Sequence, residues 1–506
     1  MTGLTHANAI RNSMKIHVTI LPTHKTVNVP AGTLVADALR LAGIVLDMPC
    51  GGQGTCGKCR VKLNGACVLA CQTKLQSDSV VEVSCQSQSD FAVQTKACSS
   101  DCLGVAVDIG TTTVETRLIE IESGAVLATL SELNAQQSFG ADVISRIHYE
   151  MTRKAGREEL TAAVVGQVQS LIDQYCGRLS IRPERIKRVC VTGNTAMLTW
   201  FTGRSARSLG SVPFAPSIPL TGQILPAACV GLNLPDAQVV VPPVIAGFLG
   251  GDILGVVDRC VHLEDCNTTR SPRKWLALDV GTNGEMAIFH NGALAAASTA
   301  AGPALEGAGI SIGTKAGAGA VNSVRVNDDG ELAWTTLNGS APTGVCGSGL
   351  IDLIACLLKT GRLLPKGKLR IPPAAPLNIT QKDVRQVQLA CGAIRTGVLA
   401  LLECVGLTMA DLDVVYIAGN FGCHLSVTSL FDVGILPPGR PDQVRFLGNL
   451  ALDAAADVLC RPDLEDALLD LNRLARSVKP INLAELPDFA DRFSKSMTFP
   501  APDTVI

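Results

Sequence analysis

The first hundred residues contain short runs in which apolar and polar positions alternate, broken by one stretch with helical spacing. Alternation predicts strands that bury one face, and apolar residues three and four positions apart predict a helix. The predicted elements are strands at 15–22 and 26–30, a helix within 31–44, a hairpin over 60–70 that turns at Asn64–Gly65, and a closing strand at 79–84. We therefore expect a flexible start at 1–13 and a small α+β domain at 14–97.

A different pattern begins at Leu103, where buried strands are followed by long amphipathic helices. The strand-turn-strand sequence LGVAVDIGTTTVETRLIEI (103–121) recurs as WLALDVGTNGEMAIFHNGALAAA (275–297), with Asp108 aligned to Asp279. Two copies in matching settings predict two related α/β subdomains. The predicted boundaries are a linker at 98–102, subdomains at 103–263 and 274–498, and a tail at 499–506.

The composition of the chain argues against a nucleic-acid-binding protein and against a membrane protein. The 506 residues include 43 basic and 45 acidic side chains, and no basic run suggests a nucleic-acid or anionic-membrane partner. No uncharged apolar run reaches the roughly 18–20 residues of a membrane span, since Pro242 and Pro243 interrupt the best candidate. Nineteen cysteines without a signal peptide indicate a soluble protein in a reducing cytoplasm.

Four cysteines form the first candidate site. Cys50, Cys56, Cys59 and Cys71 have the spacing C-x5-C-x2-C-x11-C, and glycines surround the first three. Four thiolates can hold two irons, and glycine lets the backbone pass close to a bulky group, so the pattern favours a [2Fe–2S] cluster. The alternative is structural zinc, but zinc sites usually combine two short C-x2-C knuckles and this stretch has one.

This stretch resembles the ferredoxins. LACQ (69–72) is similar to the segment that supplies the last ligand in that family, which favours Cys71 over the nearby Cys67. The order strand, strand, helix, cluster loop, hairpin and strand is that of a β-grasp ferredoxin.

The repeated D-x-G-T turns form the second candidate site. Such a turn after a buried strand can direct backbone N–H groups and hydroxyls at an anion, and its aspartate can hold hydrated Mg²⁺. A single copy would usually be an ordinary hairpin. Two facing copies would bind a triphosphate from both sides.

In these turns the chain resembles the actin, sugar kinase and Hsp70-like ATPases. The resemblance implies a duplicated α/β actin-like (ribonuclease H-like) ATPase domain after the ferredoxin domain, with Asp108 and Asp279 in catalysis. It implies phosphate contacts at Gly110, Thr111, Thr112, Thr113, Gly281, Thr282, Asn283 and Gly284, and adenosine contacts at Gly419, Asn420, Phe421 and Gly422. The segment VVYIAGNFGCHL (414–425), which contains the last four, can also be an ordinary strand followed by a turn.

Two further polar positions accompany these turns. Glu285 can orient the attacking water, although a solvated surface carboxylate is equally compatible with the sequence. The segment Gly193-Asn194-Thr195, which follows a buried strand in RVCVTGNTAMLTWF (188–201), can cap the next helix while lining the cleft.

More particular stretches resemble the reductive activators of corrinoid proteins. They are AGPALEGAGISIGTKAGAGA (301–320), TGVCGSGLIDL (343–353), RQVQLACGAI (385–394) and AGNFG (418–422). The chain departs from the family in its short linker, since some relatives carry a longer linker and a middle domain.

The resemblance implies ATP-dependent one-electron reduction of a corrinoid from Co(II) to Co(I), in support of a cobalamin-dependent methyltransferase system. It also implies a homodimer, and an external reductase as electron donor, because no strand is followed by G-x-G-x-x-G. Two alternatives are an activator of another low-potential enzyme, such as a 2-hydroxyacyl-CoA dehydratase, and a redox-sensing chaperone-like ATPase.

Overall fold

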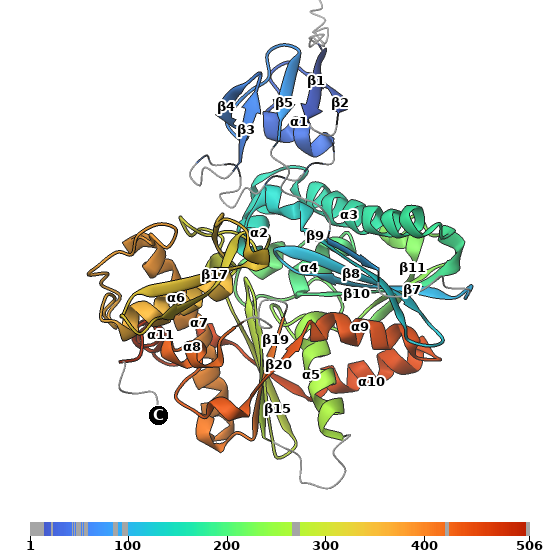
Figure 1. The fold of residues 1–506 in the computed structure, drawn as a ribbon. Coiled ribbons are helices and arrows are strands. Elements are labelled where there is room, and N and C mark those ends of the chain that lie inside the picture. The colour runs from blue at the N-terminus through green and yellow to red at the C-terminus, as the bar shows by residue number, and fades with distance from the viewer. Residues whose placement is uncertain are drawn as a thin grey trace, which may run out of the picture. The chain divides into compact units, whose positions relative to one another are not determined.

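The chain folds into two compact units (Figure 1). The computed structural model describes residues 15–21, 24–42, 44, 46, 52, 54, 59–83, 90–93, 100–265, 274–419 and 425–501. The first unit contains residues up to Gln88 together with Gln137–Ala141, and the second contains Ser89–Gln136 and Asp142–Ile506.

The first unit is a five-stranded sheet with one helix against it. Its elements are β1 (Lys15–Leu21), β2 (Lys25–Pro30), α1 (Val35–Leu41), β3 (Arg60–Leu63), β4 (Ala66–Leu69) and β5 (Ser79–Glu82), and the strand order is β2-β1-β5-β3-β4. β1 and β5 run parallel, whereas the other neighbours run antiparallel. The β3–β4 turn uses positive φ angles at Asn64 and Gly65, as the Asn-Gly pair predicted. This arrangement confirms the predicted β-grasp ferredoxin fold.

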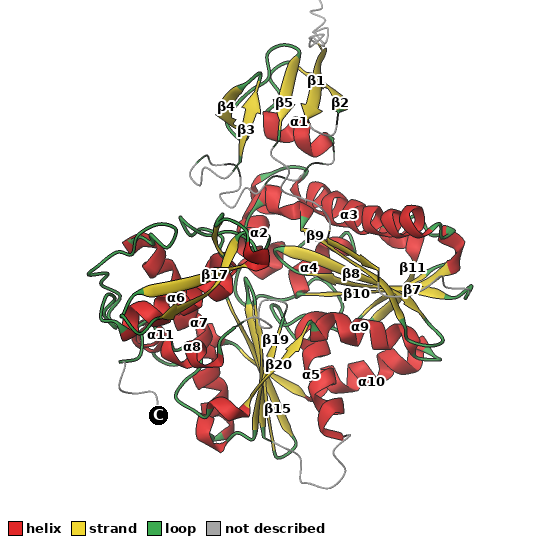
Figure 2. Cartoon of the chain, in the orientation of Figure 1, coloured by secondary structure: helices red, strands yellow, loops and turns green. Residues whose placement is uncertain are grey.

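The second unit is built on two sheets with the same core topology (Figure 2). The first sheet contains β6 (Asp90–Val93), β7 (Leu103–Ile109), β8 (Thr113–Glu120), β9 (Val126–Leu133), β10 (Ile186–Gly193), β11 (Gln223–Pro226) and β12 (Gln238–Val241). The second contains β13 (Trp275–Val280), β14 (Gly284–His290), β15 (Ala293–Thr299), β19 (Val414–Ala418), β20 (Val444–Gly448) and β21 (Val478–Ile481). The order β12-β10-β7-β8-β9 in one sheet matches β20-β19-β13-β14-β15 in the other, with matching strand directions. The predicted duplication is therefore present.

The remaining elements surround these sheets. The α-helices are α2 (Val143–Thr152), α3 (Gly156–Leu179), α4 (Thr195–Phe201), α5 (Gly251–Asp265), α6 (Gly347–Lys359), α7 (Gln381–Val405), α8 (Val427–Asp432), α9 (Leu450–Cys460), α10 (Leu464–Ser477) and α11 (Phe489–Ser496). A small sheet contains β16 (Ala320–Val326), β17 (Leu332–Thr336) and β18 (Gly344–Val345). Short 3₁₀ helices lie at Ala135–Phe139, Pro183–Arg185, Arg207–Gly210, Ala227–Val230, Pro303–Glu306, Leu337–Gly339, Met409–Asp411, Pro441–Gln443 and Leu483–Glu485.

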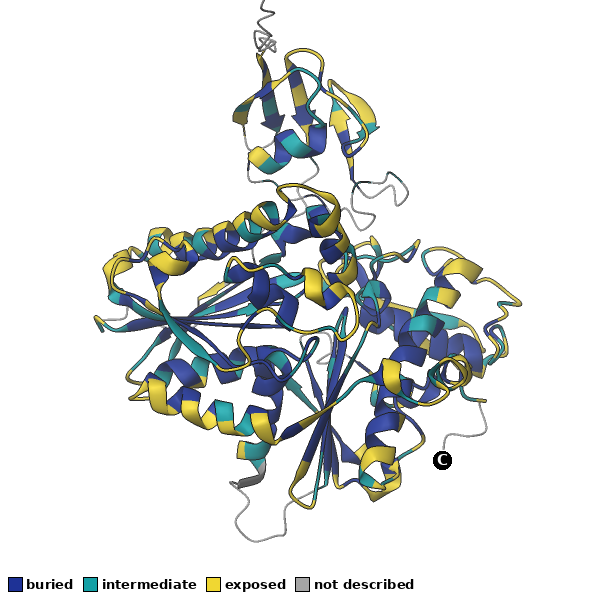
Figure 3. Cartoon of the chain, turned by 180° about the vertical axis from the view of Figure 1, so that it is seen from behind, coloured by how far each residue is buried: buried dark blue, intermediate teal, exposed yellow. Residues whose placement is uncertain are grey.

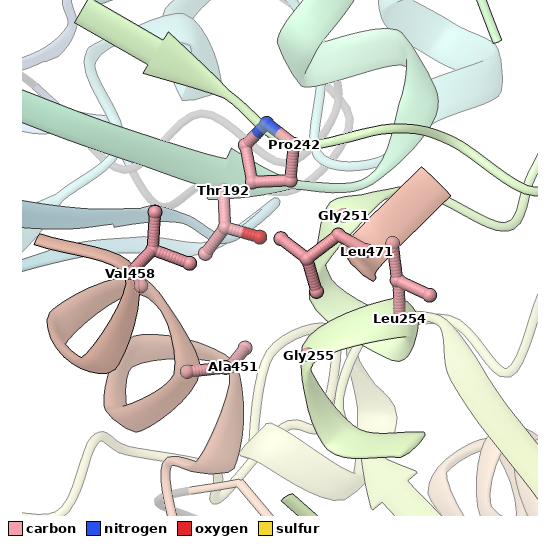
Figure 4. A pocket seen from close by; sticks show the side chains of 10 residues that line it. Thr192, Pro242, Gly251, Leu254, Gly255, Ala451, Val458 and Leu471 are labelled. Atoms are coloured by element: carbon pink, nitrogen blue, oxygen red, sulfur yellow. The ribbon is translucent and has the colours of Figure 1, made fainter. Parts of the chain in front are cut away.

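Helices α5 and α9 lie against each other between the two large sheets (Figure 1). Their contact uses small residues: a methyl group at Gly255 would lie 3.0 Å from Cβ of Ala454. A small apolar pocket at this contact is lined by both helices and by Thr192 at the end of β10 (Figure 4). The two halves of the unit therefore share one core, and strands far apart in sequence are held at its centre (Figure 3).

Three features differ from the sequence-based expectations. β6 pairs with β9 in the second unit, although residues up to 97 were assigned to the first domain. Helix α9, placed in the second subdomain, packs on β7 and β10 of the first sheet. Phe499, placed in the tail, is buried, and its N–H donates to Pro365 O at 2.9 Å. Each of these differences arises from contacts between residues far apart in the sequence. The local pattern of apolar and polar positions does not predict such contacts.

Helix α7 alone, among the described helices, is long and apolar enough by composition to cross a membrane. Most of its apolar window is buried inside the protein, as in a core helix. It lies under β14 and β15 of the second large sheet.

Candidate functional site

The two predicted phosphate loops meet in the second unit. Loop 1 (Gly110–Thr113) joins β7 to β8, and loop 2 (Gly281–Gly284) joins β13 to β14. The hydroxyl oxygens of Thr112 and Thr282 are hydrogen-bonded at 2.7 Å although the residues are 170 positions apart. The repeat found in the sequence therefore brings both turns to one place.

Asn194 supports loop 1 from the next strand. It is the N-cap of α4, where its side-chain oxygen accepts a hydrogen bond from Met197 N at 3.1 Å. Its side-chain amide donates to Thr111 Oγ1 at 3.1 Å. The predicted helix cap is therefore confirmed, and Asn194 also contacts loop 1.

A carboxylate pair lies beside loop 1. Asp108 on β7 faces Glu115 on β8 in the strand register. The Nδ2 atom of Asn449, the N-cap of α9, donates to Asp108 Oδ2 at 2.9 Å and to Glu115 Oε2 at 3.3 Å. Burial raises the pKa of Asp108 well above its ordinary value, and the hydrogen bond from Asn449 offsets part of that rise. We call Asp108, Glu115 and Asn449 the first polar group.

The second half of the unit contains a corresponding carboxylate pair. A third carboxylate lies near this pair, whereas the amide of Asn449 lies near the first pair. Asp279 faces Glu285 across β13 and β14, and Asp252 lies in the first turn of α5. Burial raises the pKa of Asp252 to about 7 and that of Asp279 to about 6. Burial and then the charges of Asp252 and Asp279 raise the pKa of Glu285 well above its ordinary value. We call Asp252, Asp279 and Glu285 the second polar group.

Glu285 is 7% exposed, so the alternative of a solvated surface carboxylate is wrong. Its Oε1 atom is buried and has no hydrogen-bond partner in the structure. Such an atom normally has one, because an unmade buried hydrogen bond is costly. Glu285 is therefore suited to accept a hydrogen bond from a bound water or to coordinate a cation.

Glu306 also contacts loop 2, and its charge raises the pKa of Asp279 further. The Thr282 hydroxyl donates to Glu306 Oε1 at 3.1 Å, and burial raises the pKa of this carboxyl. In the part of the chain that the structure describes, no three His, Cys, Asp or Glu side chains converge on a bare metal ion. Mg²⁺ usually keeps several waters and takes one or two carboxylates plus phosphates. The carboxylates present fit a hydrated ion of that kind.

Part of the predicted adenosine segment lies beside Asp279. β19 ends next to β13, and a methyl group on Gly419 would lie 2.5 Å from Asp279 Oδ1. Gly419 also has a φ of +87°, which favours glycine. Asn420, Phe421 and Gly422 lie outside the described residues.

The first unit contains the thiol site. Cys59 and Cys71 are buried and their sulfur atoms are 3.3 Å apart. Two thiolates about 2.3 Å from one tetrahedral metal ion are themselves roughly 3.8 Å apart, so this pair is close enough to ligate a single iron after the two sulfur atoms move apart by about 0.5 Å. Cys50 and Cys56 lie outside the described residues. Cys67 is exposed on β4 opposite Lys62, away from this pair.

Glycine and glutamine surround the thiol pair. The Gln72 amide donates to Gly52 O at 2.6 Å and lies 3.7 Å from the sulfur of Cys71. Gly52 and Gly54 both have positive φ angles. The backbone before Cys59 therefore has the conformations that glycine permits close to a bulky group.

Sequence reasoning missed Glu115, Asp252, Glu306 and Asn449. Glu115 was accessible through the internal repeat, because it occupies the place of Glu285 in the other copy. Asn449 follows a strand and a glycine, as Asn194 does. Asp252 and Glu306 carry no local signal.

The comparisons with known proteins agree with this geometry. Residues 18–89 match the 2Fe-2S iron-sulfur cluster binding domain, residues 103–262 match the RACo middle region, and residues 273–505 match the C-terminal domain of RACo, the ASKHA domain. The middle region is therefore present as the first half of the duplicated unit, so the expectation that this chain lacks a middle domain was wrong.

Two relatives and one solved structure are similar along most of the chain. The corrinoid activation enzyme RamQ of Eubacterium limosum is 32% identical over 431 residues, which cover 78% of this chain and 70% of that protein. The [Co(II) methylated amine-specific corrinoid protein] reductase of Methanosarcina barkeri is 26% identical over 73% of this chain and 72% of that protein. The solved reductive activator for corrinoid,iron-sulfur protein has a TM-score of 0.71 and 27% identity, covering 96% of this chain and 99% of its own. With these matches and a ferredoxin unit followed by a duplicated ATPase-like unit, the chain belongs to the family of reductive activators of corrinoid proteins.

Proposed function

We propose that the protein uses ATP to drive one-electron reduction of a corrinoid protein from Co(II) to Co(I), in support of a cobalamin-dependent methyltransferase system. The observation that carries the proposal is the meeting of two phosphate loops at Thr112 and Thr282, in a chain that also contains the buried thiol pair of Cys59 and Cys71. The names of the two relatives support a corrinoid protein as the partner.

The cysteines form the electron-carrying site. Cys50, Cys56, Cys59 and Cys71 would hold a [2Fe–2S] cluster, which stores a single electron when bound. The corrinoid cobalt accepts that electron, and a separate reductase supplies the next one. The protein acts as a homodimer in this proposal.

ATP is needed because the transfer is uphill. Plant-type clusters lie at about −400 mV, and the Co(II)/Co(I) couple is lower still. Each further 59 mV disfavours a one-electron transfer about tenfold. Energy from nucleotide binding and hydrolysis can offset this gap by changing the conformation of the activator on its partner.

The polar groups of the second unit divide the work on ATP. Asp108 and Asp279 would hold the hydrated Mg²⁺ that neutralises charge on the phosphates. Glu285, with its unpartnered Oε1, would orient the attacking water, and Asp252 would accept its proton. The backbone of both loops and the hydroxyls of Thr112 and Thr282 would bind the phosphates. Gly419 to Gly422 would lie against adenosine.

The test mixes the reduced protein with a Co(II) corrinoid protein and follows the Co(I) absorbance with and without Mg-ATP. We expect Co(I) to accumulate only with the nucleotide. The non-hydrolysable analogue of ATP is the control that separates binding from hydrolysis. If Co(I) does not form under any of these conditions while ATP is hydrolysed, the corrinoid role is wrong and the activator of a different low-potential enzyme becomes the better proposal.

A redox-sensing chaperone-like ATPase makes a different prediction. Its ATPase rate would depend on the oxidation state of the cluster and would rise with unfolded protein. We expect neither effect. Either effect, found without Co(I) formation, would favour this second candidate.

A further inference from the structure

Loop 1 is held from behind by hydrogen bonds to three successive carbonyl groups. Asn134 Nδ2 donates to Gly110 O at 2.8 Å, Arg146 Nη2 donates to Thr111 O at 2.5 Å, and the backbone N–H of Asn134 donates to Thr112 O at 2.9 Å. Each turn carbonyl thus has a fixed direction.

These bonds also fix the amide groups of the loop. In a planar trans peptide the C=O and the N–H of the next residue point in opposite directions. The N–H groups of Thr111 and Thr112 therefore point away from Asn134 and Arg146. An anion that binds a turn of this kind is bound by such N–H groups.

Arg146 is the unusual member of this support. It lies in the first turn of α2 and is 0% exposed. The same guanidinium also lies 3.3 Å from Gln136 Oε1 and 3.6 Å from the sulfur of Met197. Burial lowers the pKa of Arg146 to about 9, and Asp142 raises it, so the side chain stays charged at pH 7.

Helix α2 holds this guanidinium in place. Asp142 and Ser145 form a capping box at its start, with Asp142 Oδ1 accepting from Ser145 N at 2.7 Å. Arg146 is the next residue along the chain. Its planar group can donate in fixed directions, which a lysine cannot do.

We propose that Arg146 is the positioning residue of loop 1, which fixes the Thr111–Thr112 peptide so that its N–H binds the polyphosphate of the nucleotide. The inference rests on the proposed function, because it assumes that ATP binds at the loops. According to this inference, Arg146 affects the binding of the phosphates and not the binding of adenosine. It also places a buried positive charge immediately behind the loop.

Arg395, in the other half of the unit, provides a control for the possibility that Arg146 only stabilises the fold. Arg395 on α7 is also mostly buried, and burial lowers its pKa. It donates to the backbone carbonyls of Gly434, Val433 and Thr498. None of these groups belongs to a phosphate loop. Replacing Arg395 therefore removes a partly buried guanidinium and its carbonyl bonds without touching loop 1.

The test compares Arg146→Met, Arg146→Lys and Arg395→Met in the full-length protein with its cluster. Competition against a fluorescent ATP gives the affinities for ATP, ADP and adenosine, and thermal unfolding without nucleotide gives Tm. We expect Arg146→Met to lower the affinity for ATP and for ADP at least tenfold, and the affinity for adenosine less than twofold. Arg146→Lys keeps the charge and should weaken ATP about threefold. Arg395→Met should lower Tm with unchanged affinities.

The result that overturns the inference is an equal loss of ATP and adenosine affinity in Arg146→Met, or the same ATP loss in Arg395→Met. If Arg146→Met does not fold, wild-type ATP affinity in Arg146→Lys overturns it as well. A wild-type protein that binds no ATP overturns both this inference and the proposed function. Tight ATP binding without Co(I) formation sinks only the proposed function.

Discussion

The two polar groups of the second unit occupy matching places in the duplicated fold but differ at one residue. At the start of α9, Asn449 bridges Asp108 and Glu115 with a neutral amide. Asp252, in the first turn of α5, instead adds a third carboxylate to Asp279 and Glu285.

We call the first polar group closed, because an amide donates to both of its carboxylates, and the second open, because one of its carboxylate oxygens has no partner. In the first group the amide donates to both carboxylates and offsets part of the cost of burying Asp108. In the second group three acidic side chains oppose one another, and Glu285 Oε1 has no hydrogen-bond partner. Like charges at close range are unfavourable unless protons, water or a cation compensate them. We therefore expect the second group to do most of the chemistry and the first to support it.

The largest effect is expected from Asp279→Asn, which removes the carboxylate at the centre of the open group. Loss of a preorganised electrostatic group at the reacting phosphate should lower kcat for ATP hydrolysis about 10³-fold. Steady-state phosphate release measures it. The visible absorbance of the cluster is the control, and a variant with wild-type kcat would remove Asp279 from the mechanism.

Asp252→Asn makes the open group resemble the closed one. An amide cannot accept the proton of the attacking water, so we expect kcat to fall about 10²-fold with little change in KM. The same assay measures both constants. A rise in KM at constant kcat would instead assign Asp252 to nucleotide binding.

Asn449→Asp makes the opposite exchange and turns the closed group into three carboxylates. Losing both amide donations should lower the free energy of unfolding of the metal-free protein by about 1–3 kcal/mol. Denaturant titration measures the loss. Mg²⁺ should recover part of it in the variant and not in the wild type, and equal recovery in both would contradict the comparison.

The smallest effect is on the pH dependence of stability. The raised pKa of Asp252, about 7 against an ordinary 3.8, means that the folded metal-free protein binds a proton more tightly than the unfolded chain does. Its stability contribution is therefore present at low pH and is lost as pH rises from about 4 to about 7. Asp252→Asn should flatten this fall, changing Tm by about 2–4 °C across the window. An unchanged pH profile would show that Asp252 does not titrate there.

The sequence predicted what is local or repeated. Asp108, Asp279 and both loops were found because the turn occurs twice, and the β-grasp unit was found because its strands alternate. Glu115 was missed because loop 1 has one more residue than loop 2 between its paired carboxylates, so an ungapped alignment places Glu285 opposite Val114.

The rest depends on packing between distant segments. Asp252 reaches Asp279 and Glu285 only because α5 lies between the two sheets, and Asn449 reaches Asp108 because α9 crosses to the first sheet. The spacing of apolar residues predicts that such helices exist, but it does not predict which residues their first turns contact. Cys50, Cys56, Asn420, Phe421 and Gly422 stay predictions.

The most direct test of the account is a single-turnover comparison of the wild type with Asp279→Asn. Both proteins carry an intact, reduced cluster and are mixed with a Co(II) corrinoid protein and Mg-ATP, and the yield of Co(I) is recorded. The account predicts Co(I) in the wild type and almost none in the variant. Equal yields from the two proteins would show that the paired loops do not drive the electron transfer.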